Sequence, residues 1–200
     1  IGMLLVIGLR NEVGVDWKPY LYLANVVHRS TYLSLLERGD VAFYSLMWIA
    51  DRAGFEIWFV NLVCAIIFVV GLFSFARRQP SPWLTIAVAV PYLVIVVAMS
   101  ATRQATAIGF IFLAIVALQD NRLWRAGFWV FLASLFHASS ILMLGFAALS
   151  YTRNRFQSVL LVLLLAFPAY YLLSSNLETY VDRYSGAEIQ SAGASIRLAM

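Results

Sequence analysis

Long apolar stretches constrain this chain more than any other sequence feature. Ile57–Ala76 is an apolar run of 20 residues, and Trp83–Met99 is another of 17 residues. Because an α-helix rises about 1.5 Å per residue, runs of this length can cross about 30 Å of hydrocarbon. The chain is 62% hydrophobic and only 12% charged, which excludes a soluble globular domain. We therefore expect an all-α fold, a polytopic transmembrane helical bundle.

Shorter segments complete the expected bundle. Ten apolar residues are too few to span a membrane, so one segment fits an amphipathic helix at the interface. The chain begins within an apolar run and ends in what resembles the approach to another helix. We therefore expect one transmembrane domain, residues 1–200, that is an incomplete fragment of a larger polytopic protein. The shorter segments are, in order, a truncated span (Ile1–Leu9), a polar stretch (Arg10–Asp40), the interfacial helix (Val41–Ala50), a short span (Ala105–Leu118), an ambiguous apolar segment (Ala126–Leu149), a further span (Ser158–Leu173) and a polar stretch (Ser174–Arg197).

Basic residues in short loops predict the orientation of the spans. The arginines at 77–78 and at 122–125 mark two cytoplasmic loops, and two spans separate them. Arg103 lies between those two spans and is therefore expected on the outer side. Counting back one span from residue 77 places the segment 10–40 on the outer side as well.

The segment 126–149 allows two topologies. As a single span it would place Arg153 and Arg155 outside, against the charge rule. As a re-entrant pair broken near His137 it would return them to the cytoplasmic side, and we favour this second topology. Non-helical backbone at membrane depth is tolerated where it is buried in protein or faces water, and the serines around His137 could satisfy it.

Motifs of well-known soluble enzymes are absent from the sequence. It has no Walker loop, no Gly-x-Gly-x-x-Gly, no Gly-x-Ser-x-Gly and no His-Glu-x-x-His, which argues against ATP-driven transport. The one cysteine, Cys64, cannot form an internal disulfide, and no Cys/His spacing resembles a metal site. The net charge of +4 comes without a dense basic block, so we expect no nucleic-acid partner.

Arg103 is the strongest candidate for binding a ligand. It lies in Ala-Thr-Arg-Gln-Ala between two short spans, so this joint is expected to dip below the outer headgroups. A guanidinium there is costly unless it meets an anion or water, and its planar fork suits a phosphate or pyrophosphate. Gln104 adds a hydrogen-bond donor. The alternative is an arginine that snorkels to the headgroups.

Two further residues could handle a proton. His137, in Phe-His-Ala-Ser-Ser, could carry a proton or donate to an oxyanion. It could equally be a buried histidine that bonds a neighbouring hydroxyl or carbonyl. Glu37 could be a carboxylate base, although a simple helix-end charge explains it slightly better.

Other polar residues are candidates with plainer alternatives. Arg10 and Asp16 lie on either side of Gly14, so a turn could bring them together in a site or in a solvated ion pair. Asn61 requires no more than an interhelical hydrogen bond. Arg197 is a weaker candidate for binding.

Short motifs follow one another in a characteristic order. The pattern Arg-x-x-x-Gly-x-Asp-x-x-x-Tyr is formed by Arg10, Gly14, Asp16 and Tyr20, and Glu37 with Gly39 follows it. Thr-Arg-Gln-Ala-x-Ala-x-Gly then occupies Thr102–Gly109, and Phe-His-Ala-Ser-Ser occupies Phe136–Ser140. This order, over about residues 5 to 200, resembles the EpsG family, which is related to Wzy-type polysaccharide polymerases of bacterial envelopes.

The resemblance implies an integral membrane glycosyltransferase of exopolysaccharide, capsule or O-antigen biosynthesis. Such an enzyme would polymerise oligosaccharide repeats carried on undecaprenyl pyrophosphate, at the outer face of the bacterial cytoplasmic membrane, with no cofactor and no required metal. Pyrophosphate binding would fall to Arg103, Arg10, Gln104 and Arg197, and the base would be Asp16, Glu37 or His137. His137 is the first choice if the segment 126–149 is re-entrant, and Glu37 if it is not.

The expected partners are the lipid-linked oligosaccharide, membrane lipids and other polysaccharide-export proteins. Two alternatives have other mechanisms: a flippase for the lipid-linked oligosaccharide, and a non-catalytic membrane assembly subunit. A flippase needs polar groups through the full depth of the membrane, whereas the conspicuous charges here gather on one face. The polymerase is therefore the favoured reading.

Overall fold

The computed structural model describes residues 2–143, which form helices and connecting loops with no strand among them. This confirms the all-α class for that part of the chain. Two of the helices, α5 and α7, are long and apolar enough to cross a membrane. In chain order the helices are α1 (Gly2–Gly8), α2 (Trp17–Arg29), α3 (Tyr32–Leu36), α4 (Val41–Arg52), α5 (Ile57–Ala76), α6 (Pro82–Ala89), the π-helix η1 (Val90–Ala98), α7 (Thr102–Gln119), α8 (Leu123–Phe136) and the 3-10 helix η2 (Ala138–Leu142).

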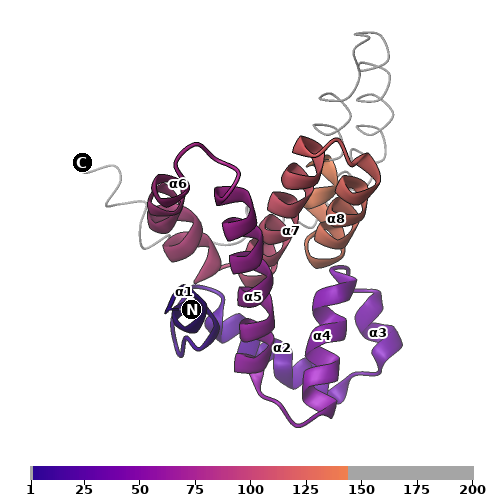
Figure 1. The fold of residues 1–200 in the computed structure, drawn as a ribbon. Helices are drawn as coiled ribbons and strands as arrows, with labels where there is room; N and C mark the ends of the chain where they lie inside the picture. The colour runs from indigo at the N-terminus through magenta and orange to yellow at the C-terminus, as the bar shows by residue number, and fades with distance from the viewer. Residues whose placement is uncertain (1, 144–200) are drawn as a thin grey trace, which may run out of the picture. The chain divides into compact units, whose positions relative to one another are not determined.

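α5 is the central helix of the described part (Figure 1). It packs most extensively against α7, and the two helices meet at Gly71 and Gly109. A Cβ atom on Gly109 would lie 2.7 Å from the carbonyl oxygen of Ile67, and one on Gly71 would overlap the carbonyl of Gly109. Small residues at such a crossing let two apolar helices approach closely.

α5 and α7 run in the same direction. Near their beginnings, the Thr102 hydroxyl donates to Asn61 Oδ1 at 3.4 Å, which is the interhelical hydrogen bond expected of Asn61. Just beyond their ends, Arg78 Nη1 lies 2.6 Å from Asp120 Oδ1. The loops with basic residues at 77–78 and 122–125 therefore share one end of the bundle, as predicted, and Arg103 lies toward the other end.

α6 and η1 return the chain between α5 and α7, where the sequence predicts a span over Trp83–Met99. Pro91 is the second residue of η1. A proline lacks the N–H group and crowds the carbonyl four residues before it. The helix widens here, so that the Met99 N–H bonds the Val94 carbonyl five residues back at 3.1 Å. The predicted span is thus two consecutive helical pieces.

α4 contains the helix predicted over Val41–Ala50 and extends it to Arg52. Its buried face carries Phe43, Tyr44 and Met47, which join a core shared with α2, α3, α5 and α8. The helix is therefore part of the packed bundle. Its place at a membrane interface stays a prediction.

α8 ends where the sequence predicts a break. His137 has extended backbone (φ −154°, ψ 108°), and the 3-10 helix η2 follows. The 14 residues of α8 span about 21 Å, short of about 30 Å of hydrocarbon. The rest of the segment 126–149, the arginines at 153 and 155, and the segments Ser158–Leu173 and Ser174–Arg197 lie outside the described residues.

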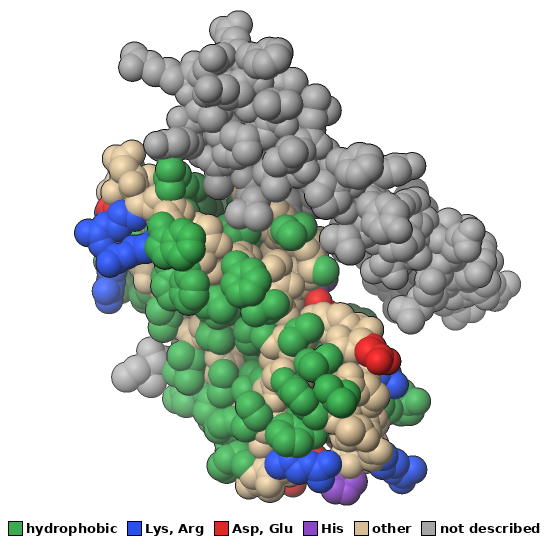
Figure 2. All heavy atoms as spheres, turned by 90° about the vertical axis from the view of Figure 1, so that its right-hand side faces the viewer, with side chains coloured by type: hydrophobic (Ala, Val, Ile, Leu, Met, Phe, Trp, Pro, Cys, Tyr) green, Lys and Arg blue, Asp and Glu red, His purple; other side chains and the backbone are tan. Residues whose placement is uncertain are grey.

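Large apolar side chains cover much of the outer surface. Figure 2 shows them over the middle of one face, with most Lys and Arg side chains toward the ends. Trp83, Val88 and Tyr92 on α6 and η1, and Trp124 and Phe131 on α8, are all more than half exposed. A monomeric soluble protein rarely exposes so large an apolar surface, whereas lipid covers it without cost.

Candidate functional site

Arg103 is the second residue of α7, and its side chain meets a carboxylate from a distant loop. Its Nη1 lies 2.8 Å from Asp40 Oδ2. The Asp40 side chain is 14% exposed and that of Arg103 is 36% exposed, so the pair is shielded on the carboxylate side and reachable on the guanidinium side. Only one of the five guanidinium N–H donors is used in this bond, which leaves others for a ligand.

Asp40 reaches this position because of the turn before α4. Gly39 and Asp40 both have left-handed backbone (φ +80° and +44°), which glycine and aspartate tolerate better than most residues. Asp40 precedes α4 but makes no side-chain capping bond to it. Its carboxylate is turned away from its own helix, and Oδ1 accepts a hydrogen bond from the Ala138 N–H at 3.2 Å.

One carboxylate therefore joins three segments that are far apart in sequence. Asp40 comes from the turn before α4, Arg103 from the start of α7, and Ala138 from the turn after α8. His137 immediately precedes Ala138 and is half-buried. We call Arg103, Asp40 and the His137–Ala138 peptide the carboxylate-bridged cluster.

Two aromatic rings lie beside the Arg103 guanidinium. Its Cζ lies 5.9 Å from the centre of the Tyr20 ring and 5.7 Å from that of Phe43. The two rings contact each other, with centroids 5.4 Å apart. A cation beside aromatic rings is attracted by their quadrupole, most strongly where water is excluded. Tyr20 is itself buried, and burial raises the pKa of its phenol, with the nearby Asp16 charge acting in the same direction.

Arg10 is only 6% exposed, so its guanidinium is buried and does not face a ligand at the surface. Its guanidinium donates to the Ala98 carbonyl and, at 2.5 Å, to the Thr102 hydroxyl. It thus closes the joint between η1 and α7, where the last carbonyls of a helix lack partners within the helix. Burial lowers the pKa of Arg10, but an arginine remains charged in proteins.

The sequence suggested that a turn at Gly14 could bring Arg10 and Asp16 together, but in the described residues these two side chains form no ion pair. Within residues 2–143, both hydrogen bonds of Arg10 go to neutral oxygens. Asp16 occupies the N-cap position of α2 without a side-chain capping bond, and its carbonyl accepts the Tyr20 N–H at 2.9 Å. Gly14 explains the path of the loop: its φ is +102°, and a Cβ atom there would overlap the Met99 carbonyl. The loop lies directly against the joint that Arg10 closes.

The other predicted site residues are not part of the carboxylate-bridged cluster. Glu37 follows the last residue of α3 and is exposed, as is Gln104 beside Arg103. Arg197 lies outside the described residues. Among residues 2–143, no three His, Cys, Asp or Glu side chains gather as metal ligands would.

The sequence reading missed Asp40 and the roles of Tyr20 and Thr102. Asp40 stands three residues after Glu37, and the signal that could have found it is the Gly39-Asp40 pair before an apolar run. Thr102 and Tyr20 lie inside the quoted motifs, but nothing in a motif says which of its members are in contact.

Comparison with known proteins gives one family. The model of the EpsG family matches residues 1–200, the whole chain. No curated protein and no solved structure matches this chain.

Proposed function

The chain belongs to the EpsG family, and from this premise we propose that it is a membrane glycosyltransferase that polymerises lipid-linked oligosaccharide repeats. Family membership and the two apolar helices indicate an exopolysaccharide-related membrane protein. The proposed donor is an oligosaccharide on undecaprenyl pyrophosphate. The proposed site faces outward from the bacterial cytoplasmic membrane in a multi-pass protein.

The carboxylate-bridged cluster is the observation that carries this proposal. Three family motifs or their neighbours, far apart in sequence, meet at Arg103, Asp40 and Ala138. Structural helix contacts alone would not require a part-exposed guanidinium at this meeting point. A guanidinium with spare donors, held beside two aromatic rings, suits a phosphate group.

The proposed reaction transfers the glycan from pyrophosphate to a sugar hydroxyl. The hydroxyl oxygen of the acceptor attacks the anomeric carbon of the donor, and the bond from that carbon to the phosphate oxygen breaks. The pyrophosphate leaves with the bonding electrons, and a base takes the hydroxyl proton. Arg103 stabilises the charge that grows on the leaving group, an effect worth about 2.7–4 kcal/mol for one well-placed donor.

The arrangement divides the candidate residues by role. His137 is the favoured base because it adjoins Ala138 in the cluster, whereas Glu37 is exposed at the end of α3. Asp40 is a positioning residue, since its two oxygens are already used by Arg103 and Ala138. Arg10 supports the joint before Arg103 and adds positive charge, and Gln104 and Arg197 are further candidates for the pyrophosphate.

Arg103→Ala tests the proposal. We expect a protein that still inserts and folds but makes no long-chain polymer, while single repeats still reach the outside. Arg78→Ala is the matched control, because Arg78 also pairs with an aspartate, Asp120, but at the opposite end of α5 and α7. Polymer length on gels and the side on which repeats accumulate are the measurements. Repeats trapped on the cytoplasmic side would indicate a flippase, and normal polymer from Arg103→Ala would indicate an assembly subunit.

A further inference from the structure

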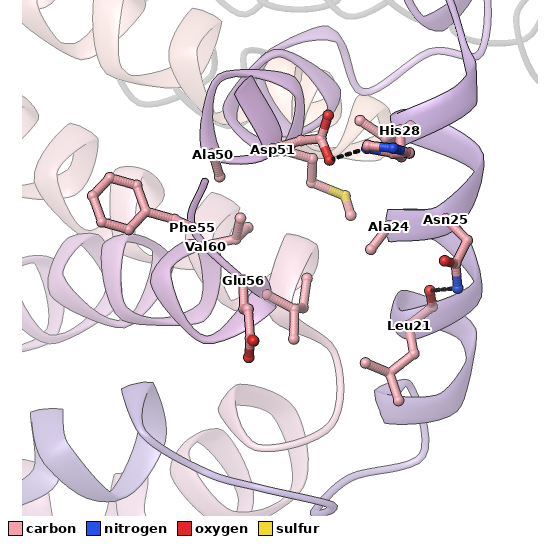
Figure 3. A pocket seen from close by; sticks show the side chains of 12 residues that line it. Leu21, Ala24, Asn25, His28, Ala50, Asp51, Phe55, Glu56 and Val60 are labelled. Atoms are coloured by element: carbon pink, nitrogen blue, oxygen red, sulfur yellow. Dashed lines mark hydrogen bonds and ion pairs between the residues drawn. The ribbon is translucent and has the colours of Figure 1, made fainter. Parts of the chain in front are cut away.

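A cavity of about 470 Å³ lies between α2, α4 and α5 (Figure 3). Apolar side chains such as Leu21, Met47 and Val60 form most of its wall. Four polar side chains also line it: Asn25, His28, Asp51 and Glu56. Cavities of about 300–1,000 Å³ with a few polar groups in an apolar wall are typical of small-ligand sites.

The two helices that contact Arg103 through aromatic rings, α2 and α4, also form part of the cavity wall. Tyr20 and Phe43 contact Arg103, and each is followed within four residues on its own helix by cavity-lining residues, Ala24 on α2 and Met47 on α4. Four residues advance a helix by about 6 Å. Along α2 and α4, the aromatic contacts of Arg103 and the cavity wall are therefore about one helical turn apart.

The charge of the cavity is opposite to that of Arg103. Its lining holds two carboxylates, Asp51 and Glu56, and neither lysine nor arginine. Asp51 Oδ1 lies 2.9 Å from His28 Nδ1, which fixes the carboxylate and leaves its second oxygen to accept another bond. Carboxylates repel a phosphate but accept hydrogen bonds from hydroxyl groups. The lining therefore favours a neutral ligand that carries hydroxyls.

Phe55 lies at the border of the cavity. It lines the cavity, is 44% exposed, and stacks on Phe59 with ring centroids 4.4 Å apart and 13° between the planes. Figure 3 shows its ring pointing away from His28 and Asp51, so it contributes apolar surface at the border of the cavity. A pyranose also has apolar C–H faces. Sugars combine such apolar faces with a rim of hydroxyl donors, which matches a wall that is mostly apolar with carboxylates in it.

We propose that this cavity binds a neutral sugar of the oligosaccharide whose pyrophosphate lies at Arg103. The assignment rests on the proposed polymerase function and adds to it the place of the first sugar. The phosphates stay with the guanidinium, and the sugar enters the acidic cavity, whose wall begins one helical turn farther along α2 and α4. Asp51 and Glu56 accept its hydroxyl protons in hydrogen bonds, and the apolar side chains of the wall contact its C–H faces.

Binding of a single repeat tests the assignment. The probe is one repeat unit, hydrolysed from the polysaccharide of the producing strain and free of lipid and phosphate, titrated into the whole purified protein in detergent. Leu21→Trp fills the cavity from its part-exposed edge and is expected to abolish binding. Asp51→Asn removes a charged acceptor and is expected to weaken binding about tenfold. Tyr22→Trp is the control, because Tyr22 is exposed on the same helix but does not line the cavity.

Each outcome decides the assignment. Native affinity in Leu21→Trp, or no saccharide binding by the unaltered protein, would overturn it. Displacement of the saccharide by farnesol would also overturn the assignment and would indicate that the cavity binds the isoprenoid chain instead. The polymerase proposal fails separately, because it predicts loss of polymer in Arg103→Ala whether or not the cavity variants bind saccharide.

Discussion

Asp40→Asn and Arg103→Met together form a double-mutant cycle that measures how strongly the carboxylate holds the guanidinium. Asparagine keeps an oxygen for the Ala138 N–H and tolerates the left-handed backbone at Asp40, so the substitution removes mainly the charge. Methionine keeps an apolar chain of similar length beside Tyr20 and Phe43 while removing the guanidinium. Each single change thus disturbs the surrounding packing as little as the chain allows.

The expected coupling follows from distance and exposure. A hydrogen bond to a charged group is worth about 1.5–3 kcal/mol in a protein. Fully exposed ion pairs contribute only about 0.2–1 kcal/mol. The Arg103–Asp40 pair, at 2.8 Å with a 36% exposed guanidinium and a 14% exposed carboxylate, falls between these cases. We expect a coupling free energy of about 1–2 kcal/mol.

Reversible unfolding in detergent, followed by circular dichroism, gives the free energy of unfolding of each variant. The same cycle at Arg78–Asp120, with Arg78→Met and Asp120→Asn, is the reference for an exposed pair. A coupling at Arg103–Asp40 no larger than at Arg78–Asp120 would refute the view that Asp40 fixes the guanidinium. Polymer length provides a second readout: if Asp40 acts through Arg103, the double variant is no worse than Arg103→Met alone.

Two predictions concern the helices themselves. Gly109→Ala would place a Cβ atom 2.7 Å from the Ile67 carbonyl oxygen, so we expect a loss of about 1–3 kcal/mol of unfolding free energy. Gly127→Ala is the control: a Cβ atom there would meet no atom within 4 Å, so its unfolding free energy in the same assay should be unchanged or higher. Equal losses in the two variants would contradict the close crossing of α5 and α7. The second concerns acid. The hydrogen bond from Arg78 lowers the pKa of Asp120, so its stabilising contribution is present above the ordinary pKa of an aspartate and is lost as pH falls through the lowered value. Melting temperatures below about pH 5 should therefore fall less steeply in Asp120→Asn than in the native protein, and identical slopes would refute the linkage.

Local patterns predicted much of the helical framework. The apolar run Ile57–Ala76 has the same bounds as α5, because twenty apolar residues between polar ends leave a helix few other boundaries. The break near His137 was predicted from polar residues inside an apolar run, and α8 ends there. The division of the span around Pro91 follows from the proline but was not predicted, since a π-helix has no simple periodic signature.

The contacts of the site depend on pairings that no local pattern contains. Asp40 and Arg103 are 63 residues apart, and Asp40 and Ala138 are 98 residues apart. The sequence named Glu37 among three candidate bases and not Asp40, which has the same chemistry, because no local pattern tells which carboxylate the turn at Gly39 directs inward. Arg10 was expected on the outer side, in a site or a solvated ion pair, and its burial became visible only with the path of the loop around Gly14.

The loop around Gly14 is fastened to the joint before α7 through main-chain oxygens. Gly14 lies against the Met99 carbonyl, and Arg10 donates to the Ala98 carbonyl. A main-chain oxygen is present whatever side chain its residue carries. Saturation mutagenesis should therefore find the two sides of this contact unequal: Gly14 and Arg10 intolerant of exchange, and Met99 replaceable by many residues of similar bulk.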